Sequence, residues 1–173
     1  YTVTSRVDHN FSDKHRLYGR FSWDFWEEEK DDAFDNLATG IFLTRKKRVF
    51  ALDDAYTAKS NLLLNVRGGF TRQLFPERRR STGFDLSSLG FSNSLVSLIP
   101  SALATFPNAT FDGYQNFSPW ESGDGFFTTD VYNVTGNAVW LVGSHNLRFG
   151  TEYRRYVENS SRFPTAVSPT IAF

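Results

Sequence analysis

The 173-residue chain contains no cysteine, which excludes disulfide bonds and metal sites built on thiolates. Nineteen basic and nineteen acidic residues cancel, so no global field attracts nucleic acid, and no nucleic-acid partner is predicted. No apolar run approaches the roughly 18 residues that a membrane-spanning helix needs. Crossing by β-strands remains open, because such strands carry only a weak alternating pattern.

Aromatic residues are abundant instead, at 17% of the chain, with Phe 18, Tyr 7 and Trp 4. This content suits the aromatic girdles of a membrane barrel or a surface that stacks on ligands. A phenylalanine-rich core of a soluble domain would also fit.

The stretch Arg6–Asp24 predicts a β-hairpin, in which four polar residues separate two runs of alternating character. Side chains alternate between faces along a strand, so the second run has one apolar and one charged face. The apolar face carries Leu17, Gly19, Phe21, Trp23 and Phe25, and the other carries Arg16, Tyr18, Arg20, Ser22 and Asp24. In a soluble sandwich the apolar face would be core, whereas in an outer-membrane barrel it would contact lipid.

Three such hairpins are predicted, over residues 2–26, 46–72 and 128–156, with long loops over 27–44 and 73–125. Short turns and long connections alternate, as they do in outer-membrane barrels with tight periplasmic turns and long extracellular loops. Within the second loop, an apolar segment predicts a short helix on each side of Pro100. The prediction is an all-β, antiparallel up-and-down meander of about six long strands, part of a transmembrane β-barrel.

Four segments together resemble the barrel of TonB-dependent outer-membrane receptors: residues 6–23, 65–72, 83–91 and 143–160. The nearest subgroup is the Oar-like receptors, which have a carboxypeptidase-regulatory-like N-terminal domain. The resemblance covers nearly the whole chain and implies a barrel of about 22 strands closed by a plug. It implies a bacterial outer-membrane location, lipid contact, the TonB protein as partner, and import of a large or scarce nutrient.

The chain departs from that family by omission, since it holds no TonB box, plug or terminal strand. It is therefore expected to be a fragment, with the remainder of the barrel and the plug as further partners. About six strands also fall short of the roughly eight in the smallest bacterial barrels. Lumen-facing positions are predicted for six arginines: Arg6, Arg16, Arg20, Arg67, Arg148 and Arg154.

The candidates for ligand contact are Arg78, Arg79, Arg80, Tyr114 and Trp120. Adjacent guanidinium groups could grip a phosphate or carboxylate, and aromatic rings could stack on a flat ligand. The alternatives are a charged loop facing solvent or lipopolysaccharide, and aromatic residues that pack the loop on itself or form the outer girdle.

No catalytic constellation is present, so we predict no enzyme, no cofactor and no metal site. His9, His15 and His145 lie near the short turns and lack the spacing of a metal site. The acidic residues of 27–35 could hold Ca²⁺ through oxygen ligands, but they lack EF-hand spacing and favour a solvated loop.

The alternative function is a soluble β-sheet domain that binds a ligand, such as a carbohydrate. It requires that a second sheet or a helix shield the apolar face, including Leu17, Phe21, Phe70 and Phe149.

Overall fold

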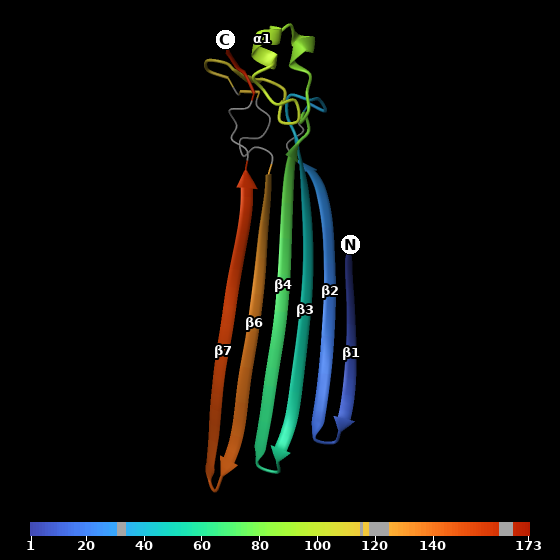
Figure 1. Cartoon of the computed structure of the whole chain (residues 1–173), viewed down its shortest axis with the longest axis vertical. Helices are drawn as coiled ribbons and strands as arrows, with labels where there is room; N and C mark the ends of the chain where they lie inside the picture. The colour runs from blue at the N-terminus through green and yellow to red at the C-terminus, as the bar shows by residue number, and fades with distance from the viewer. Residues whose placement is uncertain (31–33, 115, 118–124, 163–167) are drawn as a thin grey trace. The chain divides into compact units, whose positions relative to one another are not determined.

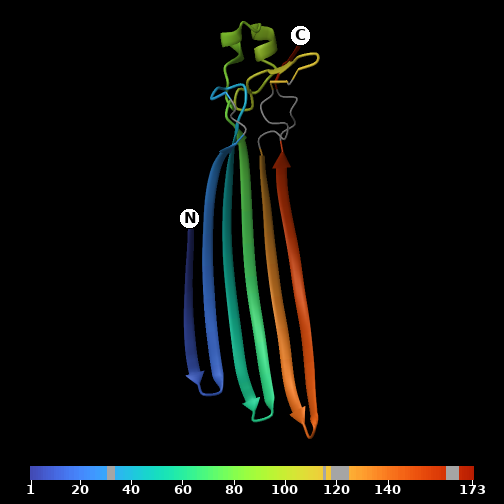
Figure 2. The same ribbon diagram turned by 180° about the vertical axis from the view of Figure 1, so that it is seen from behind.

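The computed structural model describes residues 1–30, 34–114, 116–117, 125–162 and 168–173. Six long strands form one sheet in the order β1-β2-β3-β4-β6-β7 (Figure 1). Figure 2 shows the same neighbours from behind. The strands are β1 (Thr2–Ser12), β2 (His15–Lys30), β3 (Ile41–Lys59), β4 (Leu62–Arg79), β6 (Gly125–Val142) and β7 (His145–Arg162). The predicted antiparallel meander is confirmed.

Contacts divide the chain into two units. The first comprises Tyr1–Phe25, Lys46–Leu74 and Thr128–Asn159, and it holds most of the six-stranded sheet with its three short turns. The second comprises Trp26–Arg45, Phe75–Phe127 and Ser160–Phe173. No helix among the described residues is long and apolar enough to cross a membrane.

The register of the first hairpin separates its two faces as the alternation predicts. Val3 lies opposite Trp23 and Ser5 opposite Phe21, whereas Arg6 lies opposite Arg20. Opposed residues of an antiparallel pair project on the same side of the sheet. The arginines therefore share one face, and the aromatic residues share the other.

A row of aromatic rings crosses four strands and aligns their apolar faces. Ring centroids lie 4.8 Å apart for Phe21 and Phe50, 6.3 Å for Phe50 and Phe70, and 4.9 Å for Phe70 and Tyr132. This row assigns Phe50 of β3 to the apolar face, and Asp53 consequently lies on the opposite face.

The apolar face of the first unit is not a closed core, because none of its apolar side chains is buried: Leu17, Phe21 and Phe70 are half-buried. Phe149, for example, keeps 58% of its surface exposed. The shielding required by the soluble alternative is therefore absent from this face among the described residues.

The strands extend beyond the predicted hairpins, which corrects the predicted loop boundaries. Residues 27–30, 41–45, 73–79, 125–127 and 157–162 are strand. The alternation fails there because both faces carry residues of the same kind, acidic at 27–29 and apolar at 41–43, but contacts between neighbouring strands continue the sheet. The Arg45 guanidinium lies 5.0 Å from the Trp26 ring and 5.4 Å from the Phe75 ring.

The second unit has a small core of its own, with Ile41, Leu86 and Ala104 buried. It contains the 3₁₀ helix η1 (Leu86–Leu89), helix α1 (Asn93–Val96) and a parallel ribbon of β5 (Asn108–Thr110) with β8 (Thr170–Ala172). Only one of the two helices predicted around Pro100 forms. After this proline, the amides of 103 and 104 both donate to its carbonyl, which closes a single turn.

Candidate functional site

The polar face of the sheet is organised by ion pairs. Asp53, nearly buried, accepts hydrogen bonds from the Arg67 guanidinium and from Asn65 Nδ2, the latter at 2.8 Å. Arg6 binds Asp8 through two nitrogens, at 2.8 Å and 2.6 Å. A face of paired charges suits water contact and would be costly in lipid.

The six predicted lumen residues lie on the strands as follows. Arg6 and Arg20 face each other across β1 and β2, and Arg16 lies opposite Asn10. Arg67 holds Asp53, and Arg154 pairs with Glu152 and donates to the Tyr156 hydroxyl at 3.2 Å. Arg148 is exposed on β7. Alternation along the strands places all six on the polar face, together with the Asp53 cluster.

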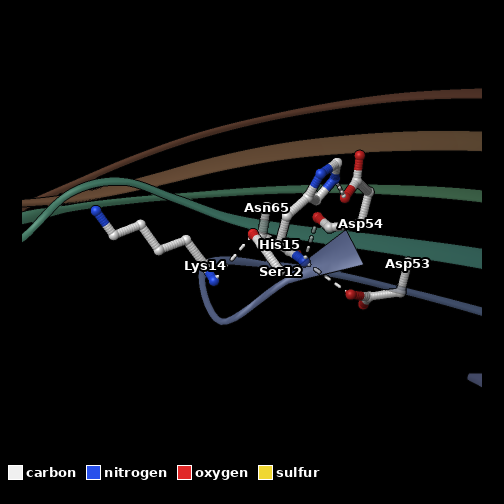
Figure 3. Close-up of polar contacts among 6 residues, drawn as sticks. All are labelled: Ser12, Lys14, His15, Asp53, Asp54 and Asn65. Atoms are coloured by element: carbon white, nitrogen blue, oxygen red, sulfur yellow. Dashed lines mark hydrogen bonds and ion pairs between the residues drawn. The ribbon is translucent and has the colours of Figure 1, made fainter. Parts of the chain in front are cut away.

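His15 makes a separate contact near the first short turn (Figure 3). Its Nε2 lies 2.7 Å from Asp54 Oδ1, while the adjacent carboxylate of Asp53 points away on the other side of the strand. Rings flank the imidazole, with centroids 4.8 Å away at Phe11 and 5.3 Å away at Tyr56. Among the described residues, no three His, Cys, Asp or Glu side chains gather where they could hold a metal ion.

The three consecutive arginines diverge. Arg78 lies 5.6 Å from the centre of the Phe42 ring, and Arg79 is buried at 3% exposure and donates to Thr105 Oγ1 at 3.4 Å. Arg80 pairs with Glu29 at 3.3 Å and with Asp35 at 2.9 Å. The structure thus gives these side chains different partners in the second unit and does not gather them around one anion.

Two acidic residues of the 27–35 segment are also engaged by Arg80, whereas Asp31 and Asp32 lie outside the described residues. Tyr114 is 82% exposed, and Trp120 lies outside the described residues.

A mainly apolar pocket of about 710 Å³ lies in the second unit. The rings of Phe111 and Phe173 stack at 5.1 Å and an interplanar angle of 8°, and Phe117 packs edge-on against Phe111 at 5.8 Å. Aromatic and aliphatic side chains supply most of the wall, and Asn36 adds an amide. Such a concave, mainly apolar cavity with few polar groups is typical of small-molecule sites.

The sequence alone indicated only some of the residues that line this pocket. Phe106, Phe111 and Phe117 belong to the aromatic cluster visible in the long loop. Ile171 and Phe173 arrive from the distant C-terminal segment, because β8 pairs in parallel with β5. No local pattern signals a three-residue parallel pairing across some sixty residues, so this wall was missed.

Long antiparallel strands with one open apolar face and one face of paired charges define a membrane β-sheet protein. The family model described as the outer membrane beta barrel domain matches residues 1–173. The chain belongs to this family, and its location is the bacterial outer membrane. No curated protein matches the sequence.

Proposed function

We propose that this chain is part of the barrel of a TonB-dependent receptor that imports a large or scarce nutrient. The apolar face of the sheet contacts lipid, and the polar face, with its six arginines, borders the wet interior. The free energy of folding in the membrane favours this orientation, because an arginine or lysine on the lipid-facing side destabilises a barrel by about 2–4 kcal/mol at the membrane midplane.

The open sheet supports the presence of further barrel strands. Among the described residues, β1 and β7 are the outer strands of the six-stranded sheet. Unpaired backbone groups cost several kcal/mol each in lipid, so both edges require partner strands. In the proposed receptor, the remaining barrel strands supply these partners, and a plug occupies the lumen and connects to TonB.

The aromatic pocket is the observation that carries the receptor function. A purely structural barrel has no need for a cavity of about 710 Å³ on its long connections. The long connections of outer-membrane barrels are extracellular loops, and a nutrient arriving from the medium contacts these loops first. The stacked rings of Phe111 and Phe173 suit a ligand with an apolar or flat portion.

Substrate depletion tests the proposal. Strains with and without the intact gene, each in the presence and absence of TonB, are grown on a complex medium. Mass spectrometry then identifies the compounds that disappear. A compound depleted only when both proteins are present is the expected result. Depletion that requires the barrel but not TonB would indicate a passive pore and overturn the assignment.

The genomic context supplies an independent check. A plug with a TonB box encoded upstream, and further alternating strands encoded downstream, are expected. A barrel completed without any plug would contradict the receptor proposal while leaving the outer-membrane assignment intact.

A further inference from the structure

The wall of the aromatic pocket carries no charged side chain among the described residues. Phenylalanine rings supply much of it, namely those of Phe91, Phe106, Phe111, Phe117 and Phe173. Leucine, isoleucine, proline and small residues supply the rest, and the amide of an asparagine is the one polar side chain among the described wall residues. Such a wall holds no counter-ion for a charged ligand.

Two charged residues adjoin wall residues in the sequence, and neither belongs to the wall. Asp35 precedes Asn36, but its carboxylate is 90% exposed and pairs with Arg80 at 2.9 Å. Asp112 follows Phe111 and is exposed. An ionised ligand in the pocket would leave water without gaining a partner of opposite charge, which is strongly unfavourable. The wall therefore favours an uncharged ligand.

The arrangement of the rings favours an aromatic ligand over an aliphatic one. Phe111 and Phe173 are nearly parallel, whereas the plane of Phe117 stands at 86° to that of Phe111. Aromatic rings prefer offset-stacked or edge-to-face pairs, with centroids about 4.5–7 Å apart. A ring of the ligand finds both arrangements in this pocket. An aliphatic ligand gains only from the burial of its apolar surface.

Contacts within the second unit hold the wall in place. The Phe34 ring lies 5.2 Å from the Phe117 ring, and Asn36 Oδ1 accepts a hydrogen bond from the Ala38 amide at 2.9 Å. Ala109 and Phe117 are joined by two backbone hydrogen bonds, at 2.7 Å and 2.9 Å. A wall that is ordered before binding reduces the entropy lost when a ligand enters. An amide also matches neutral hydroxyl or carbonyl groups, because it both donates and accepts.

We propose that the aromatic pocket binds an uncharged aromatic compound, in which a flat ring system carries neutral polar substituents such as hydroxyl groups. The ring system stacks among the phenylalanine rings, and the substituents contact the amide and backbone groups of the wall. This inference rests on the proposed function, because it names the class of substrate that the same pocket takes. It excludes ligands that are ionised at neutral pH, and it ranks aliphatic ligands below aromatic ones of the same size.

The test compares three probes of the same skeleton: 2-naphthalenemethanol, 2-naphthoate and the fully saturated decahydro-2-naphthalenemethanol. Each is titrated calorimetrically into the complete protein in lipid nanodiscs, with empty nanodiscs as the blank. The aromatic alcohol should bind saturably. Naphthoate should bind at least about tenfold more weakly, because its carboxylate finds no partner, and the saturated alcohol about twofold to tenfold more weakly. Equal affinity for either pair, or no saturable binding of the aromatic alcohol, would overturn the proposal.

A substitution then locates the binding. Phe111→Leu removes a ring from the wall but keeps the position apolar, so the aromatic alcohol should bind about twofold to tenfold more weakly. The affinity of the saturated alcohol should change little, which a general loss of structure would not produce. The matched control Phe42→Leu removes a ring of the second unit outside the wall and should bind all three probes as the wild type does. Equal losses in both variants would place the binding elsewhere and overturn the proposal.

The probe titrations contain no TonB, so they separate this inference from the receptor proposal. If the aromatic alcohol binds selectively but depletion of the substrate does not require TonB, the preference of the pocket stands and the receptor proposal fails. If the compound depleted with TonB is ionised or aliphatic, the receptor proposal stands and this inference is overturned.

Discussion

Replacing Val134 of β6 by arginine tests which face of the sheet contacts lipid. Val134 lies on the apolar face between Tyr132 and Val142, and 52% of its surface is exposed. In the proposed orientation the new guanidinium enters the hydrocarbon layer, at a cost of about 2–4 kcal/mol. This corresponds to a loss of about thirty-fold to about seven-hundred-fold in the folded-to-unfolded ratio.

The neighbouring residue provides a matched control on the same strand and at the same depth. Thr135 projects from the opposite face, which carries Asp53 and its ion-paired partners. An arginine at 135 keeps its charge in water or near carboxylates, so its cost should stay below about 1 kcal/mol.

The free energy of unfolding is measured on the complete protein in lipid vesicles by denaturant titration, with tryptophan fluorescence as the signal. Outer-membrane assembly in cells is checked on the same two variants. Equal costs for Val134→Arg and Thr135→Arg would refute the two-faced membrane model, and a larger cost for Thr135→Arg would reverse the assignment.

Four further outcomes are expected. A double-mutant cycle of Phe70→Ala with Tyr132→Ala should give a coupling of about 0.5–1.5 kcal/mol, because their rings lie 4.9 Å apart; no coupling would contradict the aromatic row. Gly68→Ala should leave stability unchanged or raise it by about 0.5–1 kcal/mol, since its added methyl group meets open space. Gly69→Ala should be less favourable than Gly68→Ala in the same unfolding assay, because the Asn133 side chain on β6 would have to turn away from the added methyl group; equal effects would show that the two faces are not packed differently. Protease resistance of the loop around Asp85 should fall as the pH drops below the ordinary carboxyl pKa of 3.8, and Asp85→Asn should remove this pH dependence.

The sign of the last effect follows from the Asp85 hydrogen bonds. The Ser87 hydroxyl donates to Asp85 Oδ1 at 2.6 Å and the Ser87 amide at 3.0 Å, and these bonds lower the pKa of the carboxyl. A lowered pKa in the folded state adds stability above pH 3.8, which is lost as the pH falls through the folded pKa. Greater protease resistance at low pH would contradict this role of Asp85, which is the N-cap residue of η1.

The sheet was predictable because its signal is local. Within Leu17–Phe25, the alternation of apolar and polar residues predicts the face of the sheet on which each side chain lies. A two-residue turn at 13–14 then determines which residues of β1 and β2 lie opposite each other. The same rule failed at residues 27–30, where consecutive acids erase the alternation although the strand continues. There the backbone pairing depends on the neighbouring strand, and the periodicity of the segment itself carries no information about that strand.

The candidate site was less accessible to sequence reasoning. Three adjacent arginines suggested a common anion, but the chain directs Arg78, Arg79 and Arg80 to different partners, including Phe42 and Thr105. Adjacent residues of a strand end project to opposite sides, so proximity in sequence does not imply a shared site.

The sequence by itself determined the two-faced meander, the short turns and the outer-membrane class, because each depends on residues a few positions apart. Tertiary structure alone decided which distant residues meet. It placed Phe173 against Phe111 to build the pocket and Phe70 against Tyr132 in the aromatic row. The physical reason is that strand register and loop closure depend on the whole set of pairings, which no single segment encodes.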